Sequence, residues 1–129
     1  MELLDKICVL EKDAERLGFC WENTTQIMAQ IESECAEIKE HLSLKFESNS
    51  AGLQEEIGDL MHAVFSLSLF CHFDPKDTLS KALFKFEKRI NAVRQLASSR
   101  GLTTLEGLSF EQIMMYWKDA KNIADKDGK

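Results

Sequence analysis

The chain has 129 residues, of which 44% are hydrophobic and 29% charged, with a formal net charge of −6. This length and apolar content predict one domain over residues 1–129 that can bury a core. The acidic balance argues against a nucleic-acid polymer as the main partner, because such binders usually carry a basic stripe. We find no apolar run of eighteen residues and no charged-then-apolar leader. We therefore expect no membrane span, no signal peptide and a cytoplasmic protein.

The apolar spacing begins with two predicted helices. Residues 1–17 read as an N-terminal packing helix that Gly18 ends. Its apolar face is expected to be Leu3, Ile7, Leu10, Ala14 and Leu17. A second helix begins near Asn23, whose side chain caps it with Gln26 in capping-box position, and it ends around Phe46.

A polar loop over residues 47–52 returns the chain into a third predicted helix, residues 51–72. A short loop between two helices favours an antiparallel pair. The later half of this helix is apolar nearly all round, including Phe65, Leu69 and Phe70, and such a helix is buried. Because a small helical domain can hardly surround one helix, we expect a homodimer in which the second subunit covers it.

Asp74 and Pro75 are the clearest helix start in the chain, an N-cap followed by proline at the first helical position. The fourth predicted helix runs to about Arg100, and Gly101 ends it. Its inward residues are expected to be Leu79, Leu83, Phe86, Ile90, Val93 and Leu96.

The last predicted helix starts from a capping box of Ser109 and Gln112 and runs to about Ala124. Residues 125–129 then read as a frayed polar tail. The fold class is therefore all-α, an antiparallel helical bundle completed by homodimerisation.

The cysteines and histidines give no transition-metal pattern. No C-x-x-C pair occurs, so we expect reduced core thiols and no structural zinc. No H-x-x-x-H spacing occurs either. The residues concerned are Cys8, Cys20, Cys35, Cys71, His41, His62 and His72.

Two acidic pairs stand out on the second and third predicted helices. Glu34 and Glu37 form one pair, and Glu56 and Asp59 form the other. A spacing of three places both carboxylates of a pair on one side of a helix. Each pair lies beside an apolar stripe, so packing the helices by their stripes lets four carboxylates converge at the edge of the seam. The stripes are Ile27, Ile31, Cys35, Ile38 and Leu42, then Leu53, Ile57, Leu60, Val64, Leu67 and Cys71.

Four converging negative charges repel one another unless a cation neutralises them. A single acidic pair is ordinary in a chain with 22 acidic residues and usually marks a solvated face. The second pair, at the matching position of an equally apolar helix, favours a hard divalent cation with oxygen ligands.

These acids also carry a resemblance to a known family. E-x-x-E followed by E-E-x-G-D resembles the signature of the MazG family of nucleoside triphosphate pyrophosphohydrolases. The acidic signature is Glu34/Glu37 with residues 55–59. Three further segments resemble the entry to that family's first long helix, its K-F-x-x-R segment and its closing W-x-x-A-K; they are residues 17–21, 85–89 and 116–121, respectively. All these motifs occur in order from about Leu17 to Lys121.

The resemblance implies a helical fold, tight dimers or dimers of dimers, and hydrolysis of a nucleoside triphosphate to monophosphate and pyrophosphate. It implies that the four acids hold Mg²⁺, with Mn²⁺ as an alternative ion. From the charges we expect one carboxylate that the metal does not fully engage, for example Glu37, to orient or deprotonate the attacking water, and the sequence does not choose among the four. The resemblance further implies that three cations contact phosphate and that Trp117 helps to shape the nucleotide site. The metal-holding and catalytic residues are then Glu34, Glu37, Glu56 and Asp59, and the cations are Lys85, Arg89 and Lys121.

The chain departs from the family pattern at three positions. Gln30 and Ser33 stand where many members have Lys and Glu, and Leu83 stands where many have Asn. These departures bear on substrate preference and rate. Without the acidic helices, Lys85 and Arg89 would read as a solvated basic face.

Two other functions stay open at this point. A helical interaction module without catalysis would explain the lost Lys and Asn. A di-iron carboxylate bundle needs Glu-x-x-His on two helices, and only Asp59 and His62 approach that pattern.

Overall fold

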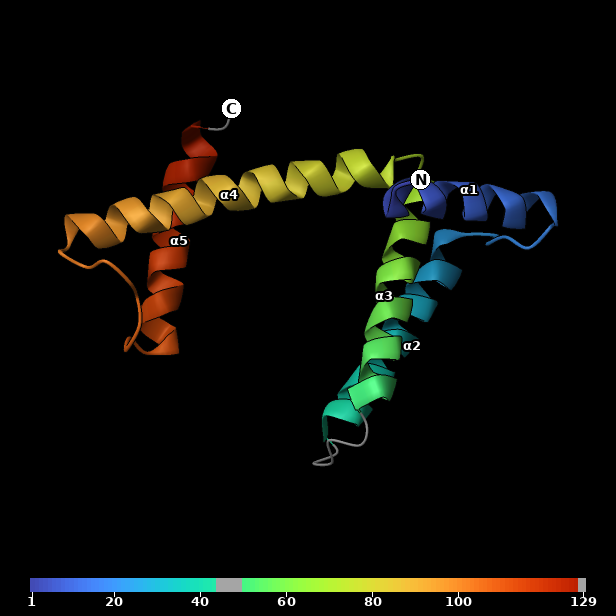
Figure 1. The fold of residues 1–129 in the computed structure, drawn as a ribbon, viewed down its shortest axis with the longest axis horizontal. Helices are drawn as coiled ribbons and strands as arrows, with labels where there is room; N and C mark the ends of the chain where they lie inside the picture. The colour runs from blue at the N-terminus through green and yellow to red at the C-terminus, as the bar shows by residue number, and fades with distance from the viewer. Residues whose placement is uncertain (44–49, 128–129) are drawn as a thin grey trace. The chain divides into compact units, whose positions relative to one another are not determined.

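The structure is a computed structural model that describes residues 1–43 and 50–127, and in these ranges it contains five α-helices and no strand (Figure 1). The all-α prediction is confirmed. The predicted end of the second helix at Phe46 lies outside the described residues. Within the described ranges, no helix is both long enough and apolar enough to span a bilayer. The helices are α1 (Leu3–Arg16), α2 (Thr24–Ser43), α3 (Ser50–Phe70), α4 (Pro75–Ser99) and α5 (Phe110–Asp127).

The chain forms two compact units, Met1–Thr78 and Leu79–Lys129. The first contains α1, α2, α3 and the first turn of α4. The second contains the rest of α4 and all of α5. The organisation of residues 1–129 as a single domain stays a prediction.

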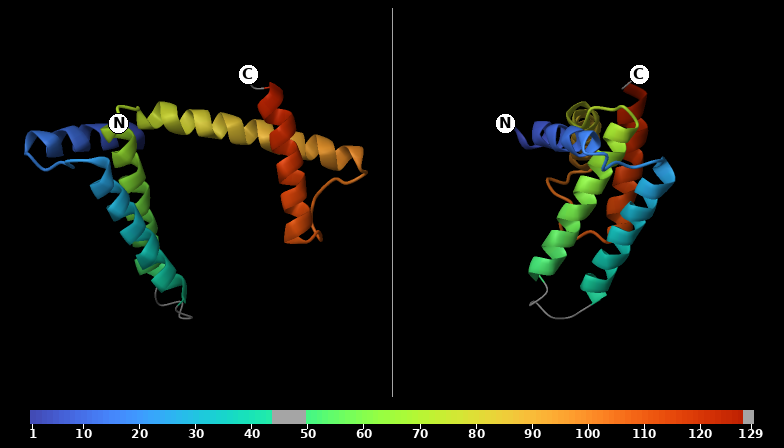
Figure 2. Two further views of the ribbon diagram at one scale, coloured as in Figure 1. Left: turned by 180° about the vertical axis from the view of Figure 1, so that it is seen from behind. Right: turned by 90° about the vertical axis from the view of Figure 1, so that its right-hand side faces the viewer.

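Helices α2 and α3 form the centre of the first unit. They lie side by side and run in opposite directions in both drawings (Figures 1 and 2), as the loop length predicts. Ile27 of α2 is fully buried, and Ala63 and Ser66 are the buried residues of α3. The Asn23 cap is confirmed, because its Oδ1 accepts a hydrogen bond from the backbone N–H of Gln26 at 2.9 Å.

The buried line of α3 differs from the predicted stripe. Ile57 and Val64 were expected to face the core but are exposed, whereas Ala63 and Ser66 are buried. The physical reason is that α3 is apolar on several sides, so periodicity alone does not select a face. Small side chains at positions 63 and 66 let neighbouring helices approach closely.

Helix α1 packs on α3 without burying any residue completely. Leu3 and Leu17 were expected on its core face but are exposed, because the contacting side is centred on Ile7, Glu11 and Ala14. Gly18 ends the helix as predicted, with a φ of +85° that an L side chain rarely adopts.

The second unit has a small core at the C-terminal half of α4. Ala92 of α4 and Ala120 and Ala124 of α5 form it, with Val93 and Leu96 packed against them. Alanine side chains allow the two helices to approach closely, but they bury little apolar area.

The N-terminal half of α4 lies outside this core. Leu79, Leu83 and Phe86 were predicted to face inward, yet all three are exposed. The reason is that the described core begins only at Ala92, so the predicted stripe continues along the helix past that core. These side chains form an apolar face in the second unit considered by itself.

The predicted helix ends of α4 and α5 are confirmed. The Asp74 carboxylate accepts a hydrogen bond from the backbone N–H of Asp77 at 2.9 Å, and Gly101 has a φ of +77°. Ser109 and Gln112 form a reciprocal capping box, with hydrogen bonds of 2.9 and 3.1 Å.

All four cysteines are free thiols, as expected. Their predicted place in the core is wrong for Cys20 and Cys71, which are exposed. Cys20 follows the end of α1, and Cys71 follows the last residue of α3, where fewer neighbours surround a side chain.

Candidate metal centre

Three of the four predicted acids meet where α2 and α3 pack together. One carboxylate oxygen each of Glu34, Glu56 and Asp59 lies within 4.8 Å of the other two. Around Mg²⁺ with ligand distances of about 2.1 Å, octahedral geometry places neighbouring oxygens about 3 Å apart and opposite ones about 4.2 Å apart. The three oxygens are therefore close to the spacing that one small cation needs.

The three acids differ in exposure. Glu34 is buried with 7% of its surface accessible, Glu56 is intermediate and Asp59 is exposed. Glu34 therefore reaches into the seam between the helices, while Asp59 lies at its rim. This gradient leaves one side of the group open to solvent and to a ligand.

Glu37 lies outside the three-residue group but interacts with it. Its carboxyl group shares a hydrogen bond with that of Glu56, and this is the largest cause that raises the pKa of Glu56 to about 7. Partial burial, a hydrogen bond to Glu34 and repulsion from both glutamates raise this pKa further. In the absence of a cation, the cluster therefore reduces its charge by keeping a proton on Glu56.

Two oxygens of this group lack the partners that buried oxygens normally have. Gln30 donates a hydrogen bond from Nε2 to Glu34 Oε1 at 2.7 Å. When all carboxylates of the cluster are ionised, they can only accept hydrogen bonds, and the buried oxygens Glu34 Oε2 and Glu56 Oε2 then have no hydrogen-bond partner among the described residues. Burying an unpaired carboxylate oxygen is costly, and a cation would satisfy both atoms. The residues present therefore fit a hard, oxygen-binding metal ion.

Sequence reasoning missed two residues beside this group. His41 Nε2 lies 3.9 Å from Glu56 Oε1, and the ring of His41 occupies the space next to Gly52. A usable signal was present, since residues 34, 37 and 41 share one face of a helix at spacings of three and four. A search for H-x-x-x-H spacing cannot find His41, because its neighbours on the helix face are acids and not a second histidine.

The predicted substrate-binding residues lie in the second unit, on α4 and α5. Arg89 makes two hydrogen bonds to Asp125, from Nε to Oδ1 at 3.1 Å and from its terminal nitrogen to Oδ2 at 2.8 Å. The guanidinium carbon of Arg89 also lies 5.9 Å from the centroid of the Trp117 ring. Phe86 packs against the same indole, with the ring centroids of Phe86 and Trp117 5.7 Å apart.

Lys85 and Lys121 belong to the same group of charges. The Arg89 hydrogen bond lowers the pKa of the Asp125 carboxyl, and the charges of Arg89, Lys85 and Lys121 lower it further. A surface pocket of about 280 Å³ adjoins the group, lined by Phe84, Lys85, Lys88 and Asp125. All three predicted cations therefore surround one carboxylate.

Asp125 itself corrects the expected end of the last helix. Residues 125–129 were expected to fray, but α5 continues to Asp127. The paired hydrogen bonds from Arg89 hold Asp125 in the helix. The sequence contains both charges, but their separation of 36 positions hides the pair.

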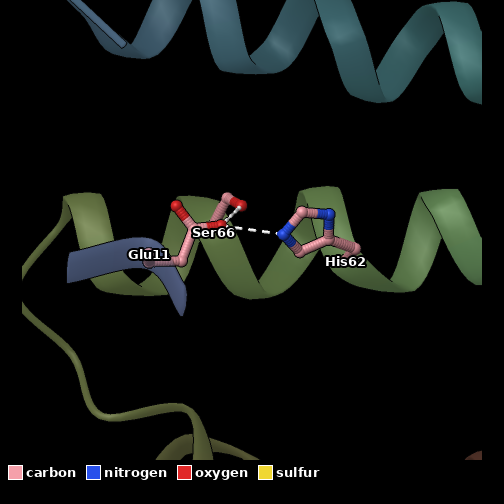
Figure 3. Close-up of polar contacts among 3 residues, drawn as sticks. All are labelled: Glu11, His62 and Ser66. Carbon is pink, nitrogen blue, oxygen red and sulfur yellow. Dashed lines mark hydrogen bonds and ion pairs between the residues drawn. The ribbon is translucent and has the colours of Figure 1, made fainter. Parts of the chain in front are cut away.

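His62 takes part in a different cluster from the one that a di-iron site would need. Its Nε2 lies 2.9 Å from Glu11 Oε1, and Ser66 donates a hydrogen bond to the same oxygen (Figure 3). Glu11 comes from α1, whereas His62 and Ser66 are one turn apart on α3. The contact joins α1 to α3, and among the described residues His62 is outside the acidic group.

Comparison with known proteins gives three relatives. The chain is 34% identical over 112 residues to the nucleoside triphosphate pyrophosphohydrolase/pyrophosphatase MazG of Thermotoga maritima, covering 87% of this chain and 41% of that protein. It is 27% identical over 112 residues to the nucleoside triphosphate pyrophosphohydrolases of Escherichia coli K12 and O157:H7, covering 42% of each. No family model matches the chain.

The chain thus spans about two fifths of the length of these curated relatives. The similarity nevertheless covers most of the present sequence, and its five helices agree with the fold that the motifs imply. The resemblance found in the motifs is confirmed: this chain is a relative of the MazG proteins, homologous to a part of those longer chains.

Proposed function

We propose that this chain binds a divalent cation at its acidic cluster and hydrolyses nucleoside triphosphates to a nucleoside monophosphate and pyrophosphate. The observation that carries the proposal is the meeting of Glu34, Glu56 and Asp59 with two buried, unpartnered carboxylate oxygens among the described residues. The names of the relatives supply the reaction class. Mg²⁺ is the ion we expect, with Mn²⁺ as an alternative, because all donors are carboxylate oxygens.

Each acid has a distinct part in this proposal. Glu34, Glu56 and Asp59 bind the ion, and Glu37 is a fourth carboxylate ligand on the exposed side of the cluster. When bound, the ion supplies positive charge to the triphosphate oxygens and makes a water molecule more acidic. Glu37 is exposed and orients the attacking water through its carboxylate. The water attacks the α-phosphorus, the bond from that phosphorus to the bridging oxygen breaks, and pyrophosphate leaves.

The three predicted cations of the second unit suit the binding of phosphate groups. Phosphate oxygens that no metal neutralises need charge-assisted donors, and Lys85, Arg89 and Lys121 provide them around one point. In the structure, the Asp125 carboxylate accepts two hydrogen bonds from Arg89. We propose that phosphate oxygens replace it and that Trp117, under the Arg89 guanidinium, contacts the nucleotide.

The motifs of the sequence favour hydrolysis at the α-phosphorus. The sequence contains no G-x-x-x-x-G-K-[ST] loop, the element that grips β- and γ-phosphates for transfer of the γ-phosphoryl group. The acidic group of the first unit, as a holder of metal, suits a pyrophosphohydrolase instead.

We also propose that the working form is a homodimer or a dimer of dimers. Leu79, Leu83 and Phe86 of α4 are exposed in the second unit, and Ile57 and Met61 of α3 are exposed in the first. Apolar faces of this extent usually mark an interface. A second copy of the chain is the occupant that the proposal names.

Product analysis with matched variants tests the enzyme function. Wild-type chain with Mg²⁺ should release pyrophosphate and monophosphate in equal amounts, and EDTA should stop the reaction. Glu34→Ala or Asp59→Ala should lose most turnover, whereas Glu40→Ala, an exposed acid on α2, should keep it. Equal turnover of the Glu34, Asp59 and Glu40 variants would show that the acidic cluster is not the active site.

A further inference from the structure

His41 occupies an unusual place between α2 and α3. Its side chain is 24% exposed, and its Nε2 lies 3.9 Å from Oε1 of Glu56. Its other ring nitrogen, Nδ1, is buried without a hydrogen-bond partner among the described residues. A polar ring held in a seam with one nitrogen toward a carboxylate suggests a role connected with that carboxylate.

Gly52 makes the space that His41 needs. A Cβ atom placed on Gly52 would lie 2.9 Å from Cε1 of His41 and 3.6 Å from each ring nitrogen. The first distance is shorter than real Cβ atoms accept, so any other residue at position 52 would displace the imidazole. Glycine is a poor helix residue, and its presence in α3 is explained by the ring that packs on it.

The direction of the imidazole proton follows from its surroundings. A neutral imidazole carries one N–H and one acceptor nitrogen. Nε2 faces a carboxylate oxygen, which accepts hydrogen bonds, whereas Nδ1 meets no acceptor among the described residues. The proton is therefore expected on Nε2, which makes this nitrogen a donor toward Glu56.

Glu34 and Glu56 have the same arrangement of their two carboxylate oxygens. Glu34 has Oε1 engaged by Gln30 at 2.7 Å and Oε2 buried without a partner among the described residues. Glu56 has Oε1 facing His41, and its Oε2 is likewise buried and unpartnered in the described part of the chain. In each glutamate, Oε1 faces a polar side chain of α2, and Oε2 remains available to bind a cation.

We propose that His41 is a positioning residue for the metal centre, with Gly52 as the gap that admits it. Donation from Nε2 to Oε1 turns the Glu56 carboxylate so that Oε2 serves the cation with Glu34 and Asp59. At 3.9 Å the contact is longer than a hydrogen bond, and a small rotation of either side chain closes it. This inference rests on the proposed function, because it presupposes a cation at the acidic cluster.

A direct ligand role for His41 agrees less well with the geometry. Among the described residues, the group whose donor atoms lie within 4.8 Å of one another contains Glu34, Glu56 and Asp59 but neither nitrogen of His41. Mg²⁺ also prefers oxygen donors to imidazole. The ring therefore acts on the cation through Glu56.

Binding of Mn²⁺ to the full chain, measured by electron paramagnetic resonance, tests this role without any turnover. His41→Leu keeps much of the ring's bulk and removes the donor, so Mn²⁺ affinity should fall on the order of tenfold or more, as is usual for residues that orient metal ligands. His41→Gln places an amide N–H near the position of Nε2 and should restore affinity close to that of the wild type. Unfolding temperatures in EDTA report whether each variant is folded.

A double-mutant cycle joins Gly52 to the same role. Gly52→Ala should weaken Mn²⁺ binding because its Cβ displaces the imidazole. In a His41→Ala background the same Gly52→Ala change should have no further effect, since there is no ring to displace. An undiminished effect in that background would show that Gly52 acts independently of His41.

The outcomes separate this inference from the proposed function. If wild type binds Mn²⁺ and releases pyrophosphate while His41→Leu binds Mn²⁺ equally well, the positioning role is wrong and the proposed function stands. If His41→Gln binds as weakly as His41→Leu, the donor role is also wrong. If wild type binds no Mn²⁺, the proposed metal centre fails, and the role of His41 fails with it.

Discussion

Glu56 is the acid whose pKa is raised by the other carboxyl groups of the cluster. Its pKa is raised from 4.5 to about 7, first by the hydrogen bond with Glu37 and then by partial burial and by Glu34. Between these two pH values, the folded chain binds more protons than the unfolded chain. The free energy of unfolding of the metal-free protein should therefore fall as pH rises through this window.

The pH dependence gives a direct test at Glu56. In EDTA, the unfolding temperature of wild type should decrease relative to Glu56→Gln between about pH 5 and about pH 8. Added Mg²⁺ should stabilise wild type increasingly over the same range, because the cation displaces the proton. The rise with Mg²⁺ should be weaker in Glu56→Gln. Parallel curves for the two proteins, with and without Mg²⁺, would contradict the raised pKa and its link to the metal.

Asp125 decides whether Arg89 is free to bind an anion. The carboxylate accepts two hydrogen bonds from Arg89, so a phosphate group must compete with it. Asp125→Asn should increase affinity for pyrophosphate severalfold, measured by calorimetry. Asp119→Asn is the matched control, because Asp119 is also on α5 but pairs with Arg100. Unchanged pyrophosphate affinity in Asp125→Asn would indicate that Arg89 serves only to join α4 and α5.

The acidic residues could be predicted from sequence, but their partners could not. The i, i+3 spacing of each pair follows from helix geometry, and the matching position of the two pairs beside apolar stripes predicted four acids. Glu34, Glu56 and Asp59 are the three that meet. The contact between His41 and Glu56 depends on how α2 is rotated against α3. Gln30 was noted only as a departure from the family's Lys, although its position four residues before Glu34 on α2 allows the hydrogen bond that the structure shows.

At the scale of single elements, the helix ends were the most predictable features. The side-chain caps at Asn23, Asp74 and Ser109 all form, because capping depends on a few adjacent residues. The buried faces were less predictable. Helix α3 is apolar on several sides, and the apolar stripe of α4 extends beyond the core that α5 provides, so packing partners rather than periodicity choose the face.

The capping box of α5 gives a test of this local control. Ser109→Ala removes the side-chain oxygen that accepts from the Gln112 N–H and should reduce the free energy of unfolding by about 1 kcal/mol. Ser80→Ala, at an exposed position within α4, should not destabilise the protein, because alanine favours a helix interior. Denaturant unfolding of the two variants measures the difference. Equal stabilities would show that the cap contributes nothing to the fold.

At the scale of the whole molecule, the exposed apolar side chains of α3 and α4 lead to the proposed oligomer. Sedimentation velocity at low micromolar concentration should show a dimer or a dimer of dimers. Leu83→Glu places a charge on the apolar face of α4 and should shift the chain toward the monomer if that face is the interface. Leu102→Glu, at a half-buried position in the loop before α5, provides a comparison away from that face. A wild-type chain that sediments as a folded monomer would contradict the proposal.

In the proposed reaction, water attacks the α-phosphorus of a nucleoside triphosphate at the acidic cluster. Hydrolysis in ¹⁸O-labelled water, followed by mass spectrometry of both products, shows which phosphorus the water attacks. The proposal predicts one ¹⁸O atom in the nucleoside monophosphate and none in the pyrophosphate, with product formation lost in Glu34→Ala. Label in the pyrophosphate, or release of inorganic phosphate with a nucleoside diphosphate, would contradict it.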